Sequence, residues 1–144
     1  MALPPLPPSA RLVVFYDGLC GVCDALTQRL LAADRRGVLA FAPLQGETAD
    51  SVRSRHRVDP TLDSILVLAD PGGPQERLLS RSAAMFAIAR ELGGWHRSLG
   101  LLRIVPRPVR DWAYDLFARH RTRFMGRLAA CRVPTPEQRR RFLP

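Results

Sequence analysis

Short apolar runs and stretches of helical periodicity alternate along the first two thirds of the chain. Compact apolar runs, rich in β-branched and aromatic residues, predict strands over 11–16, 38–44, 64–69 and 77–79, the last antiparallel to the third. Apolar residues at helical spacing predict helices over 25–33 and 83–92, and the polar, charged stretch 45–58 predicts a loop with a short helix around 49–56. Ser82 is the expected N-cap of the last helix, and Gly93-Gly94 is expected to end it.

The last third has a different pattern, without strand-like runs. Residues 95–105 predict a short helix or turns, and 109–130 predict a long helix that Gly126 bends or breaks. One broad face of that helix collects Val109, Trp112, Ala113, Leu116, Phe117, His120, Phe124 and Leu128. We expect this helical extension, residues 95–144, to pack on a sheet core formed by 11–94. A Pro-rich lead-in, disordered or extended, precedes them at 1–10.

The order of elements predicts an α/β fold. A βαβ unit followed by a hairpin and a helix, βαβ-ββα, is the thioredoxin-like order, and it agrees with the right-handed crossover rule. Cys20-Gly21-Val22-Cys23 falls where the first strand turns into the first helix, which is where such folds keep a redox pair. Cys20 at the helix N-terminus is the predicted nucleophile, because the helix dipole stabilises a thiolate there. Cys23, one turn later and expected to be more buried, is the predicted resolving thiol.

Residues near the pair have competing interpretations. Asp17 either accepts backbone N–H bonds in the turn or takes part in proton transfer. Asp24 suits the first helical turn and is interpreted as structural. A lone cysteine such as Cys131 is typically a small buried apolar residue, with a third redox partner or metal ligand as the alternative. His120 is interpreted as a core histidine, and no histidine pair has metal-ligand spacing.

Composition and charge narrow the functional classes. The 144 residues carry a net charge of +9, and residues 97–144 hold 12 arginines against three acids. This excess indicates either a solvated helical face or an acidic partner, namely nucleic acid, an anionic membrane surface or an acidic protein. Three cysteines argue against a disulfide framework, and a CxxC among reduced cytosolic thiols is more often catalytic or metal-binding. No signal peptide and no apolar run of about 20 residues is visible, so a cytoplasmic location is expected.

The sequence resembles the DCC family of predicted thiol-disulfide oxidoreductases. The resemblance centres on Tyr16-Asp17-Gly18-Leu19-Cys20-Gly21-Val22-Cys23-Asp24 and continues through Arg81-Ser82-Ala83-Ala84, Ile104-Val105-Pro106-Arg107 and Cys131-Arg132-Val133-Pro134. It covers roughly residues 12–143 and implies a thioredoxin-like fold with dithiol/disulfide activity. Asp63-Ser64-Ile65 stands where thioredoxin-like proteins usually carry a cis-proline, which leaves metal binding by the cysteine pair open.

The sequence therefore predicts a thiol-disulfide oxidoreductase with Cys20, Cys23 and Asp17 as its catalytic residues. Electrons would come from glutathione or a thioredoxin system, and no bound cofactor is expected because no nicotinamide or flavin motif is visible. Candidate substrate contacts are Tyr16, Ser64, Arg110 and Tyr114. Two alternatives stay open: a non-catalytic module that docks an acidic partner through the basic C-terminal helices, and a metal-binding protein that uses the CxxC.

Overall fold

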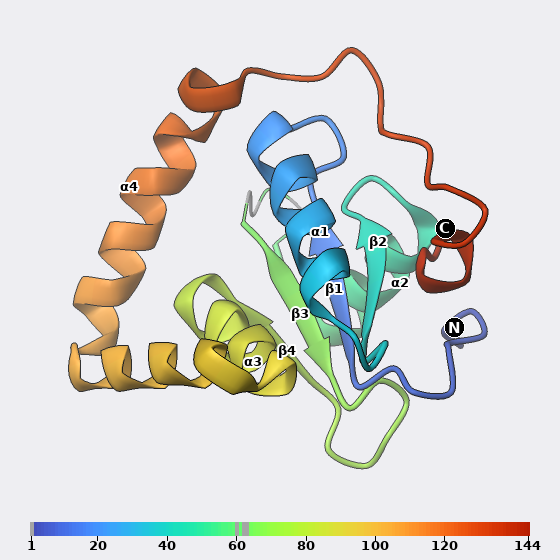
Figure 1. Cartoon of the computed structure of the whole chain (residues 1–144), viewed down its shortest axis with the longest axis horizontal. Coiled ribbons are helices and arrows are strands. Elements are labelled where there is room, and N and C mark those ends of the chain that lie inside the picture. The colour runs from blue at the N-terminus through green and yellow to red at the C-terminus, as the bar shows by residue number, and fades with distance from the viewer. Residues whose placement is uncertain (1, 60, 62–63) are drawn as a thin grey trace.

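The computed structural model describes residues 2–59, 61 and 64–144, and this part of the chain forms one four-stranded mixed sheet (Figure 1). Its strands are β1 (Leu12–Tyr16), β2 (Leu39–Pro43), β3 (Leu66–Ala69) and β4 (Arg77–Ser80). They lie in the order β2-β1-β3-β4. β1 runs parallel to β2 and antiparallel to β3, and β3 runs antiparallel to β4. The antiparallel fourth strand confirms the prediction for 77–79.

Helices fill the predicted positions between and after the strands. They are α1 (Gly21–Ala33), α2 (Glu47–His56), α3 (Arg81–Leu92), η1 (Gly94–Ile104), α4 (Arg107–Met125) and η2 (Arg139–Arg141). The result is a thioredoxin-like α/β fold with C-terminal helices, as the element order predicted. Among these described helices, none is long and apolar enough to cross a membrane.

The structure corrects the predicted N-cap of α3 and confirms the predicted break of the long helix at Gly126. Ser80, in extended backbone, is the N-cap of α3, and the Ser82 hydroxyl instead donates a hydrogen bond to Asp111 Oδ1 at 2.5 Å. The long helix ends at Met125 and not at residue 130, because the break expected at Gly126 occurs. Gly126 follows it with φ +69°, a left-handed conformation in which glycine is favoured and at which helices commonly end.

Both faces of the sheet are buried. Side chains of β1 alternate between two apolar clusters, because successive residues of a strand point to opposite faces. Leu12, Val14 and Tyr16 pack with residues of α1 and α3, while Val13 and Phe15 pack with residues of α2. Leu3 and Leu6 of the Pro-rich lead-in also pack against the second cluster, so this extended segment covers part of the core.

The end of the chain returns to the sheet. Phe142 stacks on Phe41 of β2 with ring centroids 5.5 Å apart, and the Leu143 N–H donates to the Phe41 carbonyl at 2.7 Å. Arg141 forms an ion pair with the buried Asp34 after α1. Part of the basic C-terminal segment therefore has a structural role: it neutralises a buried carboxylate and fastens the chain to β2.

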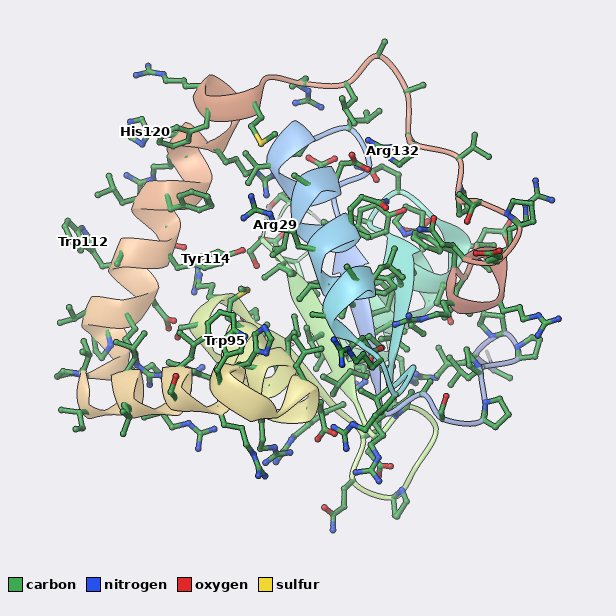
Figure 2. The ribbon with its side chains drawn as sticks, in the orientation of Figure 1. Arg29, Trp95, Trp112, Tyr114, His120 and Arg132 are labelled. Atoms are coloured by element: carbon green, nitrogen blue, oxygen red, sulfur yellow. The ribbon has the colours of Figure 1, made fainter. Side chains whose placement is uncertain are left out.

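Helix α4 packs on the sheet domain, as expected, but not through its apolar face. It contacts α1 and α3, but its apolar side chains Trp112, Leu116, Phe117 and Phe124 are exposed. Figure 2 shows Trp112 and His120 pointing away from the body of the molecule and Tyr114 pointing toward it. His120 is therefore not a core histidine. It lies on the outer side of α4, with Nδ1 2.8 Å from the Leu116 carbonyl oxygen.

Candidate active site

The cysteine pair lies at the junction of β1 and α1. β1 ends at Tyr16, a turn follows, and Cys20 is the N-cap of α1 with extended backbone angles of φ −92° and ψ 122°. The Cys20 N–H donates to the Asp17 carbonyl at 3.2 Å, which closes the turn. The sequence prediction of a cysteine at a helix N-terminus is confirmed. This position lets the unpaired backbone N–H groups of the first turn stabilise a sulfur anion.

The exposure of the two thiols is the reverse of what the sequence predicted. Cys20 is 1% exposed, whereas Cys23 is partly exposed. The cause is the segment after α4, residues 126–128, which pairs with the cysteine loop. The Gly21 N–H donates to the Gly126 carbonyl at 3.2 Å, and the Leu128 N–H donates to the Leu19 carbonyl at 2.6 Å. We call residues 126–128 the cover segment, because their hydrogen bonds to Leu19 and Gly21 hold them against the Cys20 loop.

The proton of Cys23 is held tightly. The pKa of the Cys23 thiol is raised from 9.0 to about 12, chiefly by burial and also by the charge and hydrogen bond of the neighbouring Cys20. The Arg121 guanidinium acts in the opposite direction and lowers this pKa. At neutral pH Cys23 is therefore a thiol. The Cys23 thiol donates a hydrogen bond to the Cys20 sulfur.

Arg121 joins the site from the far end of the sequence. It is 5% exposed, and its guanidinium lies 3.5 Å from Cys23 Sγ and 3.4 Å from Asp17 Oδ2. The sequence analysis missed it, because Arg121 is 98 residues from Cys23 and belongs to a chain segment full of arginines. The available signal was its spacing: Arg121 lies seven residues after Tyr114, on the same side of α4.

Asp17 has the turn role that was one of its two predicted interpretations. Its Oδ1 accepts the Leu19 N–H at 3.0 Å and the Gln45 side-chain N–H at 2.9 Å, and its Oδ2 faces Arg121. The carboxylate is buried, so these partners offset the loss of hydration. The residue thus links the cysteine loop, the turn after β2 and α4.

The candidate substrate residues occupy different surroundings. Tyr16 is buried with its ring edge against Phe142, and burial raises its pKa to about 12. Ser64 is also buried, and the hydroxyl of Tyr114 accepts the N–H of the following Ile65 at 3.0 Å. Arg110 lies instead over the ring of Phe86, 4.8 Å from its centroid. Asp63 lies outside the described residues. The structure therefore brings Tyr114 to the Ser64 segment and places the Arg110 side chain of α4 against Phe86 of α3.

Cys131 is exposed, so the interpretation of a buried apolar cysteine was wrong. Its sulfur lies so close to Gly18 that a Cβ at that position would collide with it, which places the third cysteine beside the loop before Cys20. The next residue, Arg132, donates from Nε to both Asp24 oxygens at 2.9 and 3.0 Å, so Asp24 has the expected structural role. Within the described residues, no group of three or more metal-ligating side chains is present.

Comparison with known proteins adds the family. The model of DCC1-like thiol-disulfide oxidoreductases matches residues 14–127, a span that contains the cysteine loop and all of α4. The chain belongs to this family. It is 32% identical over 134 residues to the uncharacterized protein YuxK of Bacillus subtilis (strain 168), covering 92% of this chain and 93% of that protein. It is 26% identical over 124 residues to the DCC family protein At1g52590, chloroplastic, of Arabidopsis thaliana, covering 85% and 70% respectively. No solved structure gives a significant match.

Proposed function

We propose that this DCC1-like protein catalyses thiol-disulfide exchange through a Cys20–Cys23 dithiol/disulfide pair. The observation that carries the proposal is the position of two free thiols one turn apart at the N-terminus of α1, with an arginine and a carboxylate beside them. A family description that names this activity supports it. The substrates are disulfides or thiols, and the exchange takes place in the cytoplasm with glutathione or a thioredoxin system as the thiol reductant.

The two cysteines have different roles in this exchange. The Cys20 thiolate attacks a substrate disulfide, forms a mixed disulfide and releases one substrate thiolate. Cys23 then loses its proton and attacks the Cys20 sulfur, which releases the second substrate thiolate and leaves the Cys20–Cys23 disulfide. Two electrons pass from the pair to the substrate, and the thiol reductant returns them. The high pKa of Cys23 supports this order, because it keeps the resolving thiol protonated until the first step is complete.

Arg121 and Asp17 assist the second step. The guanidinium 3.5 Å from Cys23 Sγ favours the thiolate that Cys23 must become. Asp17 holds that guanidinium in place and is the nearby carboxylate for proton transfer. Arg121 is therefore a positioning residue, which acts on the pKa of Cys23.

Access to Cys20 requires movement of the cover segment. In the described structure the Leu19 carbonyl and the Gly21 N–H are both paired with residues 126–128. An extended substrate backbone offers the same donors and acceptors, so we propose that a bound substrate replaces the cover segment in this pairing. Tyr16, Ser64 and Tyr114 are the candidate contacts for the substrate on the sheet side, and Arg110, which lies over the Phe86 ring, is the fourth candidate.

A redox titration tests the function directly. The Cys131→Ser protein retains only the two cysteines of the pair. It is equilibrated in glutathione buffers and alkylated, and mass spectrometry then measures the fraction that carries the Cys20–Cys23 disulfide. A two-electron midpoint of roughly −200 to −300 mV is expected, because that range matches cytosolic thiol systems. If no intramolecular disulfide forms at any buffer ratio, the dithiol mechanism is wrong.

Trapping variants then assign the roles of the cysteines. Incubated with a small aromatic disulfide, the Cys23→Ser protein is expected to accumulate a mixed disulfide on Cys20. The Cys20→Ser protein is expected to lose turnover, and full turnover in that variant would contradict the assignment. The matched control is Cys131→Ser, which changes the third cysteine near the loop and is expected to leave turnover unaltered.

A further inference from the structure

The outer face of α4 is apolar and uncovered. This face comprises Val109, Trp112, Leu116, Phe117 and Phe124, which follow one another at helical spacing. Trp112 is 65% exposed and Phe124 is 68% exposed, and Figure 2 shows Trp112 pointing away from the molecule. Phe117 and Phe124 stack on each other with centroids 6.0 Å apart. A contiguous apolar face of this kind on a soluble domain marks an interaction site.

The inner face of α4 is polar and already occupied. Asp111 accepts from Ser82, the Tyr114 hydroxyl accepts from Ile65, and Asp115 pairs with Arg81. Arg121 also lies on this inner face, where its guanidinium contacts Cys23 of the cysteine pair. Since polar side chains attach α4 to the domain, its apolar side chains are left for a partner. This is the reverse of the usual orientation of an amphipathic helix on a globular core.

The charges around the outer face are all of one sign. Between Gly94 and Met125 the chain has seven arginines and only two acids, Asp111 and Asp115. Both acids are held on the inner face, as described above. Arg119 and Arg123 are exposed at the edge of the apolar stripe. The outer face therefore combines aromatic and aliphatic side chains with arginines and carries no carboxylate.

An apolar cavity extends the same surface toward η1. It has a volume of about 440 Å³ and lies between α3, η1 and α4. Leu99, Leu102 and Val109 line it and are themselves exposed, so the apolar surface of α4 continues into the cavity. A flexible hydrocarbon chain fits such an open, almost wholly apolar hollow.

The sign of the charges decides between possible partners. A symmetric pairing of two α4 helices would place the arginines of one copy against those of the other, with no carboxylate on the face to compensate. An anionic bilayer offers the opposite charge to Arg119 and Arg123 and an apolar interior to the stripe beside them. Tryptophan at the edge of such a stripe is typical of the membrane interface.

We propose that the outer face of α4 binds the anionic surface of a lipid bilayer, with the helix lying in the plane of the interface. Trp112, Leu116 and Phe124 enter the acyl boundary, and the neighbouring arginines contact lipid phosphates. The inner face keeps its contacts with the sheet domain throughout. The proposal rests on the exposed face and its charge, and it stands whether or not the cysteine pair is catalytic.

Vesicle binding by the full chain tests the proposal. The reduced protein is sedimented with vesicles of phosphatidylcholine alone and with vesicles of phosphatidylcholine mixed with phosphatidylglycerol. Binding is expected only to the anionic vesicles and is expected to weaken with added salt. No binding to either vesicle, or equal binding to both, would overturn the proposal. So would a concentration-dependent dimer in sedimentation that Trp112→Ser abolishes, because the face would then be a contact between copies.

Matched variants locate the contact. Trp112→Ser is expected to weaken binding to anionic vesicles by at least about tenfold, while Trp95→Ser, at an exposed tryptophan away from this face, leaves it unchanged. Arg123→Gln is expected to weaken binding about fivefold, and Arg35→Gln, after α1, has no effect.

Fluorescence provides a second readout. In the Trp95→Phe protein the emission of Trp112 is expected to shift to shorter wavelength on anionic vesicles. In the Trp112→Phe protein the emission of Trp95 stays constant. A shift at Trp95 alone would contradict the proposed face.

Discussion

Strand β1 and helix α4 each carry a regular apolar pattern, but they place it in opposite surroundings. Every residue of β1 is buried, because α1 and α3 cover one face of the sheet and α2 covers the other. In α4 the apolar side chains point away from the domain, and the polar ones make the contacts that hold the helix. Periodicity thus identifies which side of an element is apolar, but it does not identify what covers that side.

The first prediction compares one substitution in the two regions. Phe41→Ala removes a fully buried ring that stacks on Phe142. It is expected to lower the free energy of unfolding by about 3–5 kcal/mol. Phe124→Ala removes the same phenyl ring from the exposed face of α4. This substitution is expected to change the free energy of unfolding by less than about 0.5 kcal/mol. Urea unfolding followed by circular dichroism measures both, and similar losses would show that α4 is covered in solution.

The second prediction concerns the polar inner face of α4 at the site. Arg121→Gln leaves the buried Asp17 carboxylate without its ion pair and is expected to cost about 3 kcal/mol of stability. Arg119→Gln, two residues away and exposed, is the matched control and is expected to cost little.

A double variant separates charge from packing in this prediction. Asp17→Asn in the Arg121→Gln protein removes the uncompensated carboxylate, so it is expected to restore part of the lost stability. Arg121→Gln should also raise the pKa of Cys23, since the guanidinium lowers it in the wild type. Alkylation of Cys23 against pH measures this shift, and an unchanged profile would show that Arg121 is only structural.

A third prediction follows from the raised pKa values of Cys23 and Tyr16. Both groups have a pKa of about 12 in the folded protein, above their ordinary values of 9.0 and 10.0. The folded chain therefore keeps these protons at a pH where the unfolded chain has lost them. This stabilisation is complete below about pH 9 and declines as the pH rises toward about 12.

The alkaline loss of stability has its own controls. The urea midpoint of the reduced protein is expected to fall above about pH 9, and less steeply in Cys23→Ser and Tyr16→Phe. Because each substitution removes one titrating group, the two flattened curves should begin to diverge from the wild type at different pH values. A midpoint independent of pH in the wild type would contradict the burial of these protons.

The sequence predicted well what depends on neighbouring residues. The strands, the helices between them and the position of Cys20 at the start of α1 all follow from short-range patterns, and the fold order follows from them. Arg121 and the cover segment could not be found this way. Arg121 is one of 12 arginines after residue 96, and only the folded chain brings it and residues 126–128 to the cysteine loop.

Burial of the cysteines shows the same limit. The expectation that Cys20 is accessible came from its place at a helix N-terminus, which is a local property. Its burial comes from the chain 106 to 108 residues later, at Gly126 and Leu128. Likewise, the sequence identified the apolar face of α4 correctly. The orientation of that face depends on hydrogen bonds made by the opposite face, which the spacing of apolar residues cannot predict.

The smallest expected effect tests this orientation most closely. Tyr114→Phe removes only a hydroxyl on the inner face, but that hydroxyl accepts the Ile65 N–H at 3.0 Å beside buried Ser64. The substitution is expected to cost about 1 kcal/mol, because a part-buried donor loses its partner. Leu116→Ala removes three carbons from the outer face and is expected to cost less than that in the absence of vesicles. If urea unfolding ranks the two in this order, a single oxygen on the inner face stabilises α4 more than an aliphatic side chain on the outer face. The reverse order would mean that the apolar face of α4 packs on the domain after all.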